Sequence, residues 1–118
     1  MKKALLIDDS SFMRAHIGKL LKYHNVEVAG EAENGMLAVE RYKEFHPDVV
    51  TMDITMPEMS GLDALREIIK IDPNAKVIMV SAMGQEAMVR DAILSGAKGF
   101  IVKPFKEEGI IAAIKKLC

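Results

Sequence analysis

The sequence predicts an α/β fold in which a doubly wound parallel sheet of five strands is covered by five helices. Short, almost continuous apolar runs recur five times along the 118 residues, and a stretch with apolar residues at helical spacing follows each run. Uninterrupted apolar strands are typical of parallel sheets covered on both faces, and the helices supply the crossovers. No linker or repeat interrupts this alternation. We therefore expect residues 1–118 to form one domain, without a separate effector domain.

The first half of the chain contains three predicted strands and two predicted helices. The strands cover residues 4–7, 26–30 and 48–52, and a turn is expected over residues 31–35. The alternating pattern of the second strand is typical of a less buried edge strand. Either serine of Ser10-Ser11 can cap the first helix. The expected inward-facing residues of the two helices are Met13, Ile17, Leu20, Leu21, Leu37, Ala38, Tyr42 and Phe45.

The second half of the chain adds two strands and three helices. The strands are expected at residues 76–82 and 99–102, and two of the helices at residues 62–69 and 85–94. Right-handed crossovers restrict the topology, and five such units fit the flavodoxin-like strand order 2-1-3-4-5. The stripe of the last helix consists of Ile110, Ile111, Ile114 and Leu117.

The composition excludes several classes of protein. Sixteen basic and seventeen acidic side chains give a net charge of −1, so we expect no binding to nucleic acid or to a membrane surface. The single cysteine, Cys118, cannot form a disulfide within the chain. No apolar run approaches the roughly 20 residues of a membrane span. We therefore expect a cytoplasmic monomer.

Three carboxylates are expected to converge where the winding of the sheet reverses. In the order 2-1-3-4-5 the first and third strands are neighbours at this point, and ligands bind outside the carboxyl ends of the strands there. The first strand ends at Asp8-Asp9 and the third at Asp53. Their mutual repulsion is costly unless a cation joins them or some carboxyls stay protonated. The all-oxygen set of donors favours Mg²⁺ or Mn²⁺.

A hydroxyl and an ammonium group close two further strands at the same edge, at Ser81 and Lys103. These groups are explained if a phosphoryl group binds beside the metal, because lysine pairs with phosphate oxygens and a hydroxyl can hydrogen-bond another. One carboxylate can then be the nucleophile that forms an aspartyl phosphate. Asp53 is the better candidate because it stands alone at the central strand, whereas Asp8 and Asp9 are adjacent and better placed as metal ligands.

Two rival classes of α/β protein fit these residues less well. A flavodoxin-type cofactor binder needs a Gly, Ser or Thr phosphate cradle after the first strand, and Asp8-Asp9 repels phosphate without a metal. A phosphatase of the haloacid-dehalogenase type carries its nucleophile in an Asp-x-Asp turn, which Asp8-Asp9-Ser10 does not match. We expect a protein that catalyses its own phosphorylation and dephosphorylation at Asp53 and does not turn over an external substrate.

With these residues the chain resembles the receiver domain of two-component response regulators over essentially its whole length. The motifs that carry the resemblance are Asp8-Asp9, residues 52–61 around Asp53, Ser81-Ala82 and Lys103-Pro104-Phe105. The resemblance implies that Asp53 accepts a phosphoryl group from a histidine kinase. It also implies that Asp9, Asp53 and the carbonyl of Thr55 bind Mg²⁺ directly, that Asp8 acts through water, and that Ser81 and Lys103 hold the phosphoryl oxygens.

The resemblance also implies residues for switching and for the lifetime of the phosphoryl group. Phe100 is expected to turn inward when Ser81 moves toward the phosphate; the alternative for Phe100 is a plain core aromatic. Thr55 and Met83 flank the site, and neither is an acid or amide that could orient an attacking water. We therefore expect moderate to slow self-dephosphorylation, with a helper phosphatase as a further partner. The Lys103-Pro104 peptide bond is expected to be cis.

The motifs are most similar to those of stand-alone chemotaxis regulators. This similarity implies an output partner in the flagellar motor switch, bound through the face formed by the fourth helix, the fifth strand and the fifth helix. A phosphorelay intermediate or another stand-alone regulator remains the alternative function.

Overall fold

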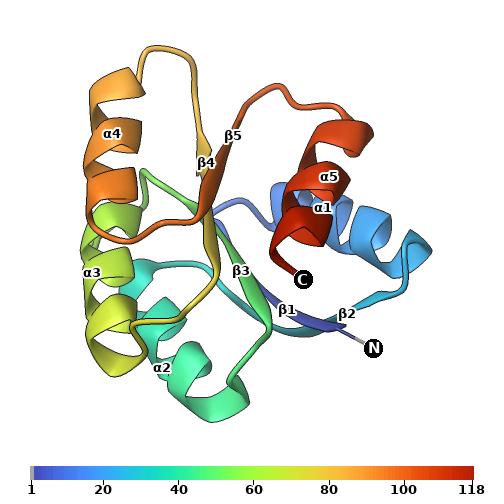
Figure 1. Cartoon of the computed structure of the whole chain (residues 1–118), viewed down its shortest axis with the longest axis horizontal. Coiled ribbons are helices and arrows are strands. Elements are labelled where there is room, and N and C mark those ends of the chain that lie inside the picture. The colour runs from blue at the N-terminus through green and yellow to red at the C-terminus, as the bar shows by residue number, and fades with distance from the viewer. Residues whose placement is uncertain (1) are drawn as a thin grey trace.

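The computed structural model describes residues 2–118 and places five strands in one sheet in the order β2-β1-β3-β4-β5 (Figure 1). All neighbouring pairs of strands are parallel. The predicted fold class and strand order are therefore confirmed, and the neighbours of β1 are β2 and β3, as a doubly wound sheet requires. The strands are β1 (Lys2–Ile7), β2 (Val26–Ala32), β3 (Val49–Asp53), β4 (Val77–Ser81) and β5 (Gly99–Val102).

Five helices cover the two faces of the sheet, α1 and α5 on one face and α2, α3 and α4 on the other (Figure 1). The helices are α1 (Ser11–Tyr23), α2 (Gly35–Phe45), α3 (Gly61–Ile71), α4 (Glu86–Leu94) and α5 (Glu107–Leu117). The side chains of Ser10, Asn34 and Ser60 cap the first three by accepting a backbone N–H from three residues further on. None of the helices in residues 2–118 is long and apolar enough to cross a membrane.

The two buried faces of the sheet explain the continuous apolar runs in the sequence. Along β1, Leu5 and Ile7 pack on the side of α2 and α3, whereas Ala4 and Leu6 pack on the side of α1 and α5. All four are at most 2% exposed. Because both sides of the inner strands β1, β3 and β4 are covered, the alternation of apolar and polar residues that marks a half-exposed strand is lost there.

The structure corrects two details of the expected elements. Strand β2 continues to Ala32, beyond the predicted end, and α2 begins at Gly35, so only residues 33 and 34 of the predicted turn over residues 31–35 lie between the two elements. A shift in register between Ala4 and Leu5 lets β2 follow β1 to its end, where Ile7 pairs with Ala32. The expected burial of Phe45 is wrong: this side chain is 37% exposed, although its ring covers the backbone of Gly30 at the edge of the sheet.

Candidate functional site

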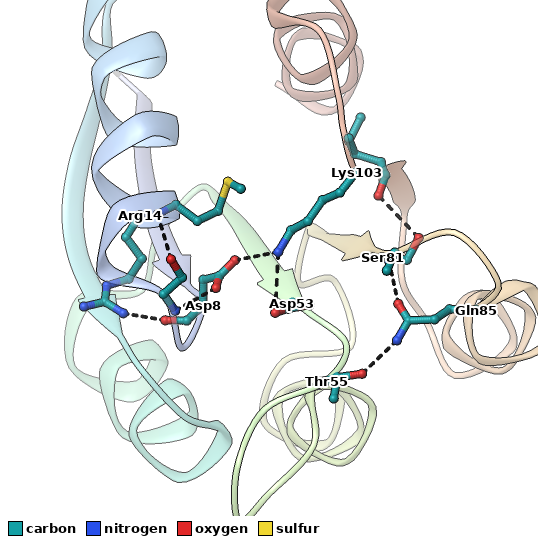
Figure 2. Close-up of polar contacts among 11 residues, drawn as sticks. Asp8, Arg14, Asp53, Thr55, Ser81, Gln85 and Lys103 are labelled. Carbon is teal, nitrogen blue, oxygen red and sulfur yellow. Dashed lines mark hydrogen bonds and ion pairs between the residues drawn. The ribbon is translucent and has the colours of Figure 1, made fainter.

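The carboxyl ends of four strands bring the predicted site residues together at one edge of the sheet (Figure 2). Asp8 follows β1, Asp53 ends β3, Ser81 ends β4 and Lys103 follows β5. Ile7 pairs with Met52, so the next residues of the two strands, Asp8 and Asp53, are adjacent. This convergence follows from parallel pairing alone, since parallel strands all end on the same side.

The three carboxylates form a tight cluster. One carboxylate oxygen from each of Asp8, Asp9 and Asp53 lies within 4.8 Å of the others. Asp8 is buried, and its Oδ1 accepts the backbone N–H of Ser10 at 2.9 Å. Asp9 is exposed and Asp53 is partly buried, so the cluster opens to solvent on the side of Asp9.

Lys103 is the cation that balances this cluster in the structure. Its Nζ lies 3.2 Å from Oδ2 of Asp8 and 3.6 Å from Oδ2 of Asp53. The backbone of Lys103 is held as well, because its N–H donates to the carbonyl of Ser81 at 2.7 Å. The Lys103-Pro104 peptide bond is cis, as expected. One ammonium group therefore faces two carboxylates and leaves a net negative site.

The environment of Asp53 raises the pKa of its carboxyl above the ordinary value. Burial is the largest cause, and the charges of Asp8 and Asp9 act in the same direction. The ammonium group of Lys103 and the backbone N–H of Thr55, which donates to the carboxylate, lower the pKa and so oppose the shift. A further cation at the cluster would favour the ionised form, which is the form that can act as a nucleophile.

The donor set of the cluster fits Mg²⁺. All three side chains offer carboxylate oxygens, which are the ligands that this hard cation prefers, and the open side leaves room for the waters that it retains. No nitrogen or sulfur ligand belongs to the cluster found in residues 2–118. The residues present therefore fit a magnesium site, and the direct coordination by the carbonyl of Thr55 stays a prediction.

The start of α3 packs closely against the chain at the end of β3. The carbonyl of Ile54 accepts the N–H of Gly61 at 2.7 Å. A side chain at Gly61 would place its Cβ 2.0 Å from the carbonyl oxygen of Asp53, so only glycine fits there. The start of α3 therefore lies directly against the end of β3, next to the acid cluster that Asp53 forms with Asp8 and Asp9.

A family model described as the response regulator receiver domain matches residues 4–115. The chain belongs to this family.

Similar proteins place the chain more closely within the receiver domains. The chemotaxis protein CheY of Thermotoga maritima is 58% identical over 116 residues, which cover 98% of this chain and 97% of the relative. CheY of Bacillus subtilis is 57% identical over 114 residues, which cover 97% of this chain and 95% of the relative. The solved CheX-CheY-BeF3-Mg²⁺ complex from Borrelia burgdorferi matches 98% of this chain and 88% of the matched chain, with 36% identity and a TM-score of 0.94.

These findings establish a CheY-like receiver domain. Such a domain is a signalling switch of two-component systems and not an enzyme with an external substrate, so the cofactor binder and the phosphatase considered above are excluded. Receiver domains bind Mg²⁺ at an acidic pocket, and the cluster of Asp8, Asp9 and Asp53 is such a pocket.

Sequence reasoning missed two residues that hold the receiver site in place. Arg14 donates to the backbone carbonyl of Asp8 and, at 2.9 Å, to a carboxylate oxygen of Glu31. Gln85 donates to Oγ1 of Thr55 at 2.8 Å and accepts the backbone N–H of Ala82 at 2.6 Å (Figure 2). Only the spacing of three residues between Ala82 and Gln85, over which a Gln side chain can reach back to a backbone N–H, could have indicated the contact with Ala82. Nothing in the local sequence indicated the others.

The predicted switch and lifetime residues lie at the rim of the site. Ser81 is buried, and its Oγ donates to the carbonyl of Ile101 over a long 3.5 Å. Phe100 is 50% exposed, so the alternative of a plain core aromatic does not describe this structure. Thr55 and Met83 are both exposed. Their roles in switching and in the lifetime of the phosphoryl group stay predictions.

Proposed function

We propose that this receiver domain, taken as residues 1–118, is a phosphorylation-activated switch in chemotaxis and that Asp53 is the residue phosphorylated. The observation that carries the proposal is the placement of Asp53 at the carboxyl end of the central strand, within 4.8 Å of two other acids and 3.6 Å from Lys103. The relatives named CheY, which match over nearly their full length, support chemotaxis. A histidine kinase is the proposed donor.

The reaction is a transfer of one phosphoryl group from nitrogen to oxygen. A carboxylate oxygen of Asp53 attacks the phosphorus of a phosphohistidine on the kinase. The phosphorus–nitrogen bond breaks, and its electron pair returns to the imidazole ring. The product is an aspartyl phosphate, and the group that reacts is the ionised form of Asp53. Thr55 supports that form through its backbone N–H, and Lys103 supports it through its charge.

Mg²⁺, held by Asp9, Asp53 and the carbonyl of Thr55 with Asp8 acting through water, would neutralise charge on the transferring oxygens. The Nζ of Lys103 lies 3.2 Å from Asp8 and 3.6 Å from Asp53, and its flexible side chain can follow a phosphoryl group added to Asp53. The long contact between Ser81 and Ile101 is weak, and the hydroxyl of Ser81 is therefore free to turn toward another oxygen.

Output requires a surface that responds to the phosphoryl group. A groove between α4 and β5 begins at Ser81 in the site and contains Phe100, together with exposed apolar side chains. We propose that phosphorylation changes this groove through Ser81 and Phe100 and that the face of α4, β5 and α5 binds a protein of the flagellar motor switch. The complex of a CheY relative with CheX supports a second partner, which we propose to be a phosphatase.

Phosphorylation with a small phosphodonor tests the proposal. The purified protein is incubated with acetyl phosphate and Mg²⁺, and adduct formation is measured by intact mass. The wild type and Asp63→Asn should form an acid-stable, base-labile adduct, whereas Asp53→Asn should form none. Asp63 is a matched control because it is an exposed carboxylate in the first turn of α3. An unmodified wild type, or equal labelling of Asp53→Asn, refutes the mechanism.

Partner binding then separates chemotaxis from a phosphorelay. A peptide from a flagellar motor-switch protein should bind the phosphorylated wild type more tightly than Asp53→Asn. Transfer of the phosphoryl group onward to a histidine phosphotransfer domain, without peptide binding, would favour the phosphorelay.

A further inference from the structure

The hydrogen-bond ladder between β3 and β4 stops short of the site. The N–H of Val50 donates to the carbonyl of Lys76, and the N–H of Ile54 donates to the carbonyl of Val80. The regular parallel pattern would continue with the N–H of Ala82 donating to the carbonyl of Ile54. That carbonyl accepts the N–H of Gly61 at the start of α3, and the N–H of Ala82 donates to a side chain.

The side chain of Gln85 accepts the hydrogen bond that the N–H of Ala82 would otherwise donate to β3. Asp53, the last residue of β3, pairs with Val80, and Thr55 and Ala82 each lie two residues further along the chain, beyond the ends of the paired strands. The carboxamide of Gln85 spans this gap: its Oε1 accepts the N–H of Ala82 at 2.6 Å, and its Nε2 donates to the hydroxyl of Thr55 at 2.8 Å (Figure 2). Gln85 therefore joins the two loops that leave β3 and β4 beside the acceptor.

The N–H of Ala82 lies at the same edge of the sheet as the acceptor Asp53, one residue beyond the end of β4. Ala82 is the residue after Ser81, and Ser81 pairs with Val102, so Ala82 is level with Lys103 on the neighbouring strand. A phosphoryl group adds three oxygens that accept hydrogen bonds, and a charged acceptor binds an N–H more strongly than a neutral amide does. The carboxamide of Gln85 thus accepts from the N–H of Ala82, a donor that can instead bond to an oxygen of the phosphoryl group.

We propose that Gln85 is a positioning residue of the phosphoryl switch, which holds the Ala82 N–H in the unphosphorylated protein and releases it when Asp53 carries a phosphoryl group. The inference rests on the proposed function of Asp53. Thr55 anchors the carboxamide and so makes its release harder. Competition of this kind lowers the affinity of the site for the phosphoryl group.

Release of Gln85 acts directly on α4. The helix begins at the next residue, Glu86, and the carbonyl of Gln85 accepts the N–H of Val89 in its first turn. Ala92 is the one residue of α4 that is fully buried, so the helix is held by little apolar contact. Loss of the bridge therefore frees the start of α4 and the loop over residues 82–84, all of whose residues are exposed. The bridge couples the acceptor to the groove between α4 and β5.

Beryllofluoride with Mg²⁺, a phosphoryl analogue, tests the proposal without turnover. Its affinity is measured by titration for the wild type, Gln85→Met, Thr55→Val and Asp53→Asn. Gln85→Met keeps the length of the side chain and removes both hydrogen bonds, so beryllofluoride should bind about threefold to tenfold more tightly. Thr55→Val removes only the anchor, and the gain should be smaller. The amide resonance of Ala82 should shift on titration of the wild type.

The outcomes separate this inference from the proposed function. If Gln85 only stabilises the start of α4, Gln85→Met should be less stable than the wild type and should not bind beryllofluoride more tightly. Thermal unfolding of each variant measures that loss of stability. If Gln85→Met and Thr55→Val bind beryllofluoride no more tightly than the wild type, while Asp53→Asn does not bind it, Gln85 has no such role. If the wild type itself fails to bind beryllofluoride, the proposed function of Asp53 is wrong and this inference falls with it. Should Gln85→Met not fold, the direction of the change in Thr55→Val decides.

Discussion

Replacing Lys103 with methionine removes the charge that balances two carboxylates and keeps most of the apolar stem. The side chains of Asp8 and Asp53 are only 3% and 13% exposed, so neither carboxylate is well solvated without a cation. The variant therefore leaves two close negative charges without their ion-pair partner, and metal-free protein should lose stability.

The size of the loss follows from the burial of the groups. Removing one partner of a buried ion pair costs about 3–5 kcal/mol. The side chain of Lys103 is 26% exposed, and water screens part of the interaction. We therefore expect Lys103→Met to lower the free energy of unfolding by about 2 kcal/mol, or the melting temperature by about 8 °C, in the absence of metal. The loss should shrink at acidic pH, where the carboxylates are protonated.

Unfolding by urea in EDTA and across a series of Mg²⁺ concentrations measures both effects. Lys103 competes with a cation for the same oxygens, so Lys103→Met should gain more stability from Mg²⁺ than the wild type does. Lys98→Met is the matched control because Lys98 is exposed and lies outside the site. The reasoning is refuted if Lys103→Met loses no more than Lys98→Met in EDTA and gains no more from Mg²⁺.

Three further predictions concern single positions. The pKa of Asp53 in the folded protein is raised above the ordinary value of 3.8, so between these two pKa values the folded protein holds more protons than the unfolded chain. The free energy of unfolding therefore falls as pH rises from 3.8 through the folded pKa. Asp53→Asn should remove this fall, which chemical unfolding in EDTA at a series of pH values measures. Gly61→Ala should lower the free energy of unfolding by about 3 kcal/mol, because the new Cβ meets the backbone of Asp53. Gly109→Ala, which has open space around it, should raise the free energy of unfolding by about 0.5–1 kcal/mol. Chemical unfolding compares the two variants. Thr55 and Met83 cannot readily orient water, so the phosphoryl group should outlast a few seconds, and loss of the adduct within seconds contradicts this.

The fold was predictable because its signals are local and repeated. Each buried strand appears as a short apolar run, and each helix shows a stripe at helical spacing, so an error in one element does not change the fold class. The end of β2 was misjudged because the register shift beside Ala4 depends on the partner strand. Phe45 was misjudged because its ring lies at the edge of the sheet, where spacing in the helix does not reveal how far the neighbouring strand extends.

The sequence by itself determined that Asp8, Asp9, Asp53, Ser81 and Lys103 share one edge, because parallel strands all end on the same side of a sheet. Only the tertiary structure decided how these groups pair. The position of the Lys103 ammonium group between Asp8 and Asp53, the hold of Arg14 on the Asp8 carbonyl and the bridge made by Gln85 each depend on the conformation of a long side chain. Such a conformation is selected by groups distant in sequence, once the fold has brought them within hydrogen-bond distance.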